Sequence, residues 1–150
     1  MFSYAGSILR VDLTKRNIRS EPTPEKGLRK YLGGRALAAK IMLDELKPGV
    51  DPLGVENKLI FATGPLTGLT FPACAKYGVI AKSPLTETWG EAYAGGFFGA
   101  ELRHSGYDMV IFEGRAETPV FLLIREGEPE IRDAKHLWGK ITGEVENAIR

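Results

Sequence analysis

Glycine is the residue that most restricts how this chain can fold, because it accounts for 18 of the 150 residues. The glycines do not form a linker; they cluster between short apolar runs. Glycine in such places permits tight turns or a close approach of the backbone to a ligand. The sequence therefore predicts many short elements with tight connections rather than a few long helices.

The apolar runs and their flanking residues predict alternating short strands and helices. Thr23 followed by Pro24 indicates a helix start, with Thr23 as the N-cap, and Gly106 indicates a helix end. Strands are expected at residues 7–13, 58–62, 77–82, 109–113 and 120–124, with returning segments at 18–21 and 130–132. Helices are expected at residues 24–32, 36–46 and 95–105, and from about 142 onward.

A weak internal repeat links the two ends of the chain. Residues 8–11 and 18–20 align with residues 121–124 and 131–133 at a constant offset of 113. Each copy reads as a hairpin followed by a helical stretch, although any two β-hairpins resemble each other. If the repeat is real, the first copy spans about 1–116 and a partial second copy about 117–150, which predicts that the chain is a fragment or half of something larger.

Charge and cysteine content exclude several classes of function. Twenty basic and 19 acidic residues give a net charge of +1, so no nucleic-acid partner is expected. No apolar run approaches the roughly 20 residues that span a bilayer, and charges at the amino terminus argue against a signal peptide, so a cytoplasmic location is expected. Cys74 is the only cysteine, so this chain cannot hold an iron–sulfur cluster alone, since such clusters need about four thiolates.

The strongest candidate site is the segment at 91–102, in which a small-residue run leads into the helix predicted to end before Gly106. Helix N-termini present unpaired amide groups, and glycines such as Gly95, Gly96 and Gly99 let a phosphate approach them. The spacing is not that of a dinucleotide-binding fingerprint. Close packing of a helix on a sheet also requires glycine, and spacing alone leaves both readings open.

Two further loops, at residues 64–68 and 82–86, follow predicted strands and could converge on Gly95. Lys76 starts the second of those strands and offers a point charge suited to phosphate, although a solvated lysine is the ordinary alternative. Only His104 and His136 are present, and no hydrolase or metalloprotease motif appears. We therefore assign no catalytic residue in this chain.

Seven short motifs, in order along the chain, together resemble the amino-terminal domain of the aldehyde:ferredoxin oxidoreductase family of tungsten enzymes. They are GSILRVDLT at 6–14, YLGGRALA at 31–38, DPLG and ENKLI at 51–60, GPLTG at 64–68, AKSPLT at 81–86, GAEL and GYD at 99–108, and DA and LWGK at 133–140.

This resemblance implies an α+β fold of mixed β-sheets with a few helices and an internal duplication whose second copy is incomplete here. It implies a tungstopterin cofactor, with tungsten, or alternatively molybdenum, held by two pterins whose phosphates are bridged by magnesium. The implied reaction is oxidation of an aldehyde to a carboxylic acid, with electrons passing through an iron–sulfur cluster outside this chain to ferredoxin.

The resemblance also carries site residues onto this sequence. The basic phosphate contact falls on Lys76, and the pterin and magnesium loop falls on Tyr93, Ala94 and Gly95, with Gly96 beside them. Family members commonly have Asn at the position of Tyr93. A backbone carbonyl contact to magnesium would survive that change, whereas a side-chain amide contact would not.

The family's cluster cysteines and acid–base residues have no counterpart here, so the chain is not expected to be active alone. The expected partners are the remaining domains of the same enzyme or a partner subunit. Two alternatives stay open: a non-catalytic binding or assembly module that docks on a partner chain or forms a homo-oligomer, and a subunit of an aromatic-ring reductase of the same superfamily.

Overall fold

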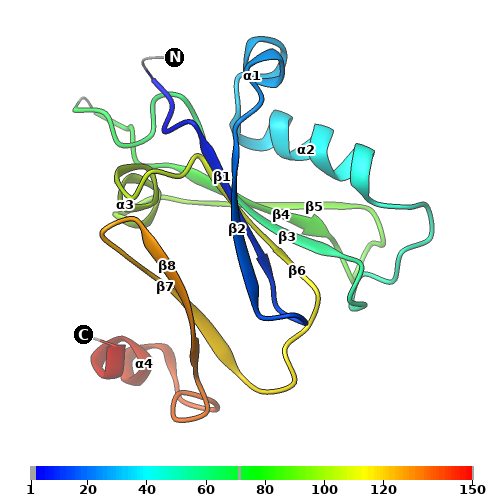
Figure 1. Ribbon diagram of the computed structural model, residues 1–150, viewed down its shortest axis with the longest axis vertical. Helices are drawn as coiled ribbons and strands as arrows, with labels where there is room; N and C mark the ends of the chain where they lie inside the picture. Colours follow the sequence, from blue (N-terminus) through cyan, green and yellow to red (C-terminus); the bar gives the residue numbers. More distant parts are fainter. Residues whose placement is uncertain (1–2, 71, 150) are drawn as a thin grey trace.

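The computed structural model describes residues 3–70 and 72–149 and has an α+β fold, as predicted. A six-stranded mixed sheet has the order β2-β1-β6-β3-β4-β5, and β7 and β8 form a separate hairpin (Figure 1). The strands are β1 (Ser7–Asp12), β2 (Asn17–Pro22), β3 (Lys58–Thr63), β4 (Tyr77–Lys82), β5 (Trp89–Ala94), β6 (Met109–Glu113), β7 (Val120–Arg125) and β8 (Glu128–Asp133). The helices are α1 (Glu25–Tyr31), α2 (Gly34–Glu45), α3 (Phe98–His104) and α4 (Thr142–Ile149).

Strand direction brings distant loops to one end of the large sheet. Strand β1 runs parallel to β6, and every other neighbouring pair in this sheet is antiparallel. Strands β3 and β5 therefore end at the edge where β1, β4 and β6 begin. We call this end the upper edge.

Helices α1 and α2 cover one face of the large sheet. Alternate residues of the inner strands, including Ile8, Ile60, Ile80 and Ile111, are fully buried on this face. They pack against apolar residues of the two helices, among them Leu28, Leu37, Ala38, Ile41 and Met42. Because side chains alternate across a strand, the same strands supply a second core to the opposite face.

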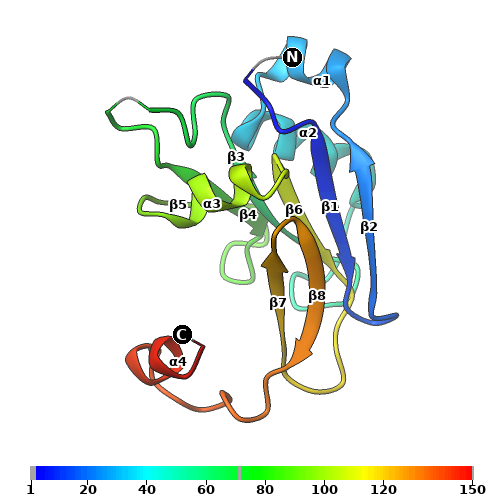
Figure 2. The same cartoon turned by 60° about the vertical axis from the view of Figure 1, so that its left-hand side comes forward.

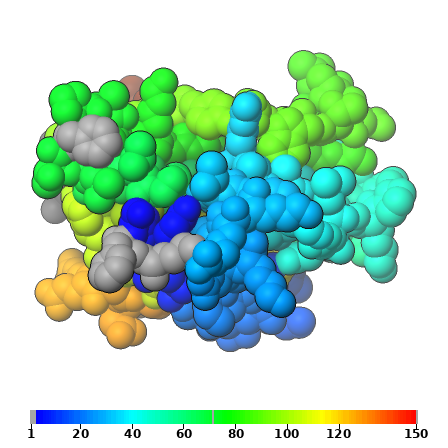
Figure 3. Space-filling view, turned by 90° about the horizontal axis from the view of Figure 1, so that it is seen from above, coloured from blue at the N-terminus to red at the C-terminus, as the bar shows by residue number. Residues whose placement is uncertain are grey.

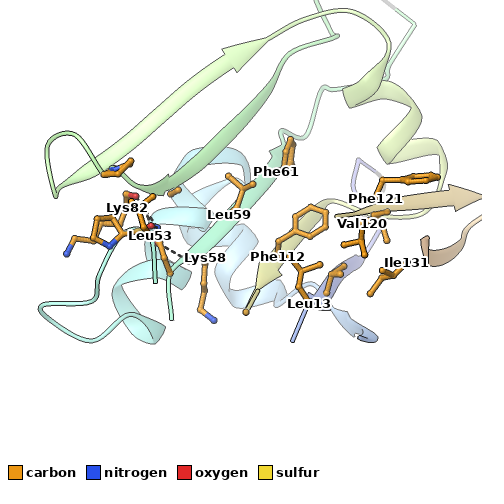
Figure 4. A pocket seen from close by; sticks show the side chains of 17 residues that line it. Leu13, Leu53, Lys58, Leu59, Phe61, Lys82, Phe112, Val120, Phe121 and Ile131 are labelled. Carbon is orange, nitrogen blue, oxygen red and sulfur yellow. Dashed lines mark hydrogen bonds between the residues drawn. The ribbon is translucent and has the colours of Figure 1, made fainter. Parts of the chain in front are cut away.

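The opposite face is covered by α3 and, in part, by the β7–β8 hairpin (Figure 2). Leu9, Val11 and Val110 contact Leu102 of α3, and Leu122 and Ile131 of the hairpin lie against this cluster. An apolar hollow of about 570 Å3 remains between the sheet and the hairpin (Figure 4). Its lining includes Leu59, Phe61 and Phe112 from the sheet and Val120 and Ile131 from the hairpin.

An ionic cluster around the buried Arg10 side chain connects the strands to the end of α2. The guanidinium of Arg10 donates hydrogen bonds to Glu21 (2.7 Å) and to both oxygens of Glu45 (2.8 and 2.5 Å). Lys58 lies 2.6 Å from Glu113 and 3.1 Å from Glu45. Although burial opposes its charge, the hydrogen bonds that Arg10 donates to Glu45 and Glu21 raise the pKa of its guanidinium.

Most predicted elements are confirmed, with three differences. Strand β5 was not predicted, because it is an exposed outer strand containing Gly and Ala, both of which have low β-propensity. Helix α3 begins at Phe98 rather than residue 95, since Gly96 has a φ of +82° and cannot join a helix. Thr23 is not a cap; its hydroxyl donates to the buried Asp108 carboxylate (2.8 Å), and Pro24 holds the N-cap position.

The hairpin recurs, but not at one constant offset. Strands β1 and β7 begin 113 residues apart, at Ser7 and Val120, whereas β2 and β8 begin 111 residues apart, at Asn17 and Glu128. The second hairpin has a turn two residues shorter, so the one-to-one alignment of its returning strand was wrong by two positions. The division into repeats of about 1–116 and 117–150 stays a prediction.

Within the described part of the chain, none of the helices is both long enough and apolar enough to cross a membrane.

Candidate functional site

The five predicted site residues come together at the upper edge. Tyr93 and Ala94 end β5, and Gly95 and Gly96 follow directly. In the ladder between β4 and β5, Tyr77 is paired with Ala94. Lys76, one residue before Tyr77, and Gly95, one residue after Ala94, therefore lie just beyond the last pair of the ladder, at the same end of the hairpin. Two segments that are distant in sequence meet here because β4 and β5 form an antiparallel hairpin.

The glycines of this segment divide into two kinds. A Cβ built on Gly95 or Gly96 would meet no atom within 4 Å, so their backbone is open to a ligand. A Cβ on Gly99 would lie 3.1 Å from both the Ala75 carbonyl oxygen and Thr67 Cγ2. The packing alternative therefore holds for Gly99, whereas Gly95 and Gly96 leave room for a bound group.

The electrostatics of this edge favour an anion. Helix α3 begins directly after the open glycines, without a side-chain cap, and the first amides of a helix lack intrahelical partners. Lys76 is exposed, and within residues 3–70 and 72–149 its ammonium has no hydrogen-bond or ion-pair partner. The combination of open amides and an unpaired ammonium is suited to phosphate.

The side chain of Tyr93 is directed along β5 and away from the glycines. Its hydroxyl donates to Glu91 (3.3 Å), a carboxylate that also accepts hydrogen bonds from Trp89 Nε1 (3.0 Å) and Arg35 (3.1 Å). The hydrogen bond from Trp89, with the charge of Arg35, holds the pKa of the exposed Glu91 carboxyl below its ordinary value. This cluster connects β5 to the first turn of α2.

The backbone of Tyr93 faces the open side of the sheet. The Ser83 N–H donates to the Thr88 carbonyl (2.8 Å), which identifies Ser83 and Thr88 as a hydrogen-bonded pair. Such pairs alternate with non-bonded pairs along an antiparallel ladder, so the Gly78–Tyr93 pair is of the non-bonded kind. The Tyr93 carbonyl therefore points away from β4, at the free edge of the outer strand, where a cation can reach it.

One of the two candidate loops joins this site and the other does not. The loop at 64–68 follows β3 at the upper edge, beside the amino-terminal segment (Figure 3). The loop at 82–86 instead belongs to the β4–β5 turn at the opposite end of those strands, so its predicted convergence on Gly95 was wrong. The error follows from the unpredicted strand β5, which places a whole strand length between the two.

Three residues at this edge had not been singled out from the sequence: Thr67, Arg103 and Asp108. Thr67 and Asp108 are buried, and Arg103 is partly buried. Thr67 bonds to the Lys76 carbonyl, Arg103 to the Gly64 carbonyl, and Asp108 to the amides of Ala5 and Gly6. Thr67 lay in a quoted motif, but nothing local indicated that its hydroxyl would bond to the Lys76 backbone. His104, in the last turn of α3, has its Nε2 3.2 Å from the Gly68 carbonyl oxygen of the same loop.

The hollow beside the hairpin contains none of the predicted site residues. Its two lysines have protein partners: Lys82 donates to the Val50 carbonyl (2.5 Å) and Lys58 to Glu113 (2.6 Å). In the described residues, no group of three or more His, Cys, Asp or Glu side chains could hold a metal ion.

Comparison with known proteins connects this geometry to one family. The profile of the aldehyde ferredoxin oxidoreductase N-terminal domain matches residues 8–150. The sequence is 49% identical, over all 150 residues and 25% of the relative's length, to the tungsten-containing aldehyde ferredoxin oxidoreductase of Pyrococcus abyssi. It is 40% identical over 142 residues, 93% of this chain and 22% of the relative, to the WOR-like subunit of an aliphatic sulfonate oxidoreductase of Pyrococcus furiosus.

A solved structure has the same fold. The active site complex BamBC of benzoyl coenzyme A reductase, in complex with 1,5-dienoyl-CoA, superposes with a TM-score of 0.96 at 40% identity, over 98% of this chain and 22% of that one. The chain spans about a quarter of the length of the curated relatives that it matches. Its sequence and fold together show that this chain belongs to the aldehyde ferredoxin oxidoreductase N-terminal domain family.

Proposed function

We propose that this chain holds the phosphate-bearing end of a pterin cofactor in a tungsten-dependent oxidoreductase. The observation that carries the proposal is that the open Gly95–Gly96 backbone and the exposed Lys76 lie at the same end of the β4–β5 hairpin. Amide groups and a lysine together provide directed hydrogen bonds and a charge for phosphate.

The residues at the upper edge fit such a group. Gly95 and Gly96 leave space for phosphate oxygens, and the outward carbonyl of Tyr93 offers a hard oxygen ligand of the type that magnesium prefers. The Tyr93 side chain is occupied by Glu91, which favours the backbone contact over a side-chain contact. The Asn-to-Tyr difference from other family members is then compatible with a magnesium site.

Bound tungstopterin would supply the two-electron oxidation of an aldehyde to a carboxylic acid. The residues of this chain bind and orient it, and we assign none of them a proton-transfer role. The iron–sulfur cluster and the ferredoxin contact are proposed for the parts of the protein beyond this quarter of the relatives' length. Whether the metal is tungsten or molybdenum is decided by metal analysis.

A second candidate is an aromatic-ring reductase subunit, because the BamBC complex has nearly the same fold at 40% identity. The higher identity of 49% to a tungsten-containing aldehyde ferredoxin oxidoreductase favours aldehyde oxidation. Assays of the full-length protein with aldehydes and with aryl-CoA thioesters separate the two. Turnover of the thioester without turnover of any aldehyde would reverse this ranking.

The cofactor proposal is tested by purifying the full-length protein and measuring tungsten, molybdenum and pterin. We expect Lys76→Met to weaken cofactor retention roughly 10- to 100-fold, because a hydrogen bond to a charged group is lost. Lys76→Arg should retain it, and Lys140→Met, at an exposed lysine before α4, serves as the control. A fully active wild-type preparation without metal or pterin would refute the proposal.

A further inference from the structure

A single buried hydroxyl joins the two loops that flank the site. Thr67, which is 5% exposed, accepts a hydrogen bond from the Gly64 N–H (3.1 Å) and donates one to the Lys76 carbonyl (2.8 Å). The donor and acceptor capacity of this hydroxyl is therefore used to fix the backbone of Lys76 to the loop after β3.

The methyl group of Thr67 contacts the helix on the other side. A Cβ on Gly99 would lie 3.1 Å from Thr67 Cγ2, so helix α3 packs directly on this side chain. Thr67 thus lies between the Lys76 segment and the helix that follows the open glycines. Its position determines the spacing between the two halves of the proposed phosphate site.

The loop is itself anchored in the protein core. Arg103 of α3 donates hydrogen bonds to the Gly64 carbonyl (2.9 Å) and to the Ser3 carbonyl (2.6 Å), and its guanidinium lies 3.6 Å from the Asp108 carboxylate. Asp108, which is 4% exposed, also accepts hydrogen bonds from the amides of Ala5 and Gly6. A continuous set of polar contacts therefore runs from the core to the Lys76 backbone.

We infer that Thr67 is a positioning residue for the cofactor, and that it acts by holding the Lys76 backbone at the end of the β4–β5 hairpin where Gly95 also lies. The lysine side chain is exposed and has many rotamers, so a fixed backbone is what restricts where its ammonium can lie. Removing the hydroxyl deprives the Lys76 carbonyl of this hydrogen bond without changing the lysine side chain. This inference rests on the proposed function.

The test uses the full-length protein loaded with its cofactor and measures how fast tungsten and pterin are lost at a fixed temperature. Thr67→Val removes the hydroxyl at nearly constant volume, and we expect cofactor loss to be roughly 5- to 10-fold faster. Thr67→Ser keeps the hydroxyl and should stay within about twofold of the wild type. If Thr67 acts through Lys76, the double variant with Lys76→Met should lose cofactor no faster than Lys76→Met alone.

The matched control is Thr63→Val. Thr63 is equally buried, and its hydroxyl also donates a 2.8 Å hydrogen bond to a backbone carbonyl, that of Asp108 rather than Lys76. We expect the two valine variants to lower the unfolding temperature of the cofactor-free protein similarly, while only Thr67→Val accelerates cofactor loss. If both variants accelerated cofactor loss equally, Thr67 would contribute only to general stability, and the inference would be overturned.

The remaining outcomes separate this inference from the proposed function. If Lys76→Met loses cofactor fast but Thr67→Val loses it at the wild-type rate, the inference is overturned and the proposed function stays intact. The same conclusion follows if the two effects are additive in the double variant. Fast loss from Thr67→Val with none from Lys76→Met removes Lys76 from the site and overturns the inference as well. Wild-type retention in both single variants overturns both.

Discussion

The ring of Tyr93 occupies the space beside Gly78 on the neighbouring strand. A Cβ built on Gly78 would lie 3.2 Å from Tyr93 Cε1 and 3.2 Å from the buried Ile80 side chain. Gly78 and Tyr93 are direct partners in the ladder, and cross-strand pairs of this kind stabilise a sheet. Because residue 78 has no side chain, the Tyr93 ring can pack against β4. This packing holds the outer strand β5, which ends at the proposed site, in place.

Gly78→Ala should displace the Tyr93 ring and loosen β5. We expect a loss of about 1–3 kcal/mol in the free energy of unfolding, as for other additions to a packed position. Trp89 reports on the same face of β5, so its fluorescence in a Trp138→Phe background should change as well. Gly143→Ala, where a Cβ meets no atom within 4 Å, is the control and should do neither.

Tyr93→Phe and Tyr93→Asn should keep the cofactor. The phenol contacts Glu91 rather than the glycine loop, and the proposed magnesium contact is the backbone carbonyl. We expect pterin and magnesium content within about twofold of the wild type, because a 3.3 Å hydrogen bond at an exposed site contributes little. Loss of magnesium from the Phe variant alone would show that the side chain takes part.

Gly95→Ala separates cofactor binding from folding. The added methyl meets no protein atom, so the unfolding temperature of the cofactor-free protein should not change. If phosphate occupies that space, cofactor content should fall roughly tenfold or more, since overpacking at a tight contact costs about 1–3 kcal/mol. Unchanged cofactor content, measured as metal and pterin per chain, would place the phosphates elsewhere.

Gly96→Ala should behave differently, because Gly96 has a φ of +82°. Alanine in this region costs about 1 kcal/mol, so this variant should lose stability even without cofactor. A calorimetric comparison of cofactor-free Gly95→Ala and Gly96→Ala therefore checks the local backbone geometry. Equal melting temperatures for the two would contradict it.

The Arg10 cluster should make the fold sensitive to acid. Burial disfavours the charge of Glu45, but hydrogen bonds from Arg10 and Lys58 outweigh it and lower the pKa of the Glu45 carboxyl below its ordinary value of 4.5. A carboxyl with a lowered folded-state pKa stabilises the fold above its unfolded-state value. This contribution is then lost as the pH falls below 4.5 and through the folded-state pKa.

Two variants test this cluster. Arg10→Met removes the charged hydrogen bonds to Glu21 and Glu45, although Lys58 stays beside Glu45. We expect a cost of about 1.5–3 kcal/mol, read as faster hydrogen exchange of the β1 amides. Glu45→Gln should lose less hydrogen-exchange protection than the wild type when the pH is lowered from neutral to acid. Arg29→Met, which breaks an exposed pair with Glu25, is the control and should cost less than about 1 kcal/mol. If Glu45→Gln lost as much protection in acid as the wild type, the acid sensitivity would come from other carboxylates.

Sequence reasoning succeeded where a signal is local. The apolar runs at residues 58–62, 77–82 and 109–113 are the inner strands β3, β4 and β6, and Gly106, with a φ of +95°, ends α3 as predicted. The exposed strand β5 lacks both an apolar run and good β-propensity, so nothing local indicated it. Because β5 was missing, the loop at 82–86 was assigned to the wrong end of the sheet.

By itself, the sequence determined where the inner strands lie, where several turns fall and which family its motifs resemble, because apolar runs, glycine and proline act over a few neighbouring residues. Only the tertiary structure decided that β1 pairs with β6 about 100 residues away, that Lys76 and Gly95 lie at the same end of the β4–β5 hairpin, and that Thr67 joins Lys76 to the core. Strand pairing is selected by hydrogen bonds between distant segments. A local pattern can show that a strand has a buried face, but it does not specify which strand will lie beside it.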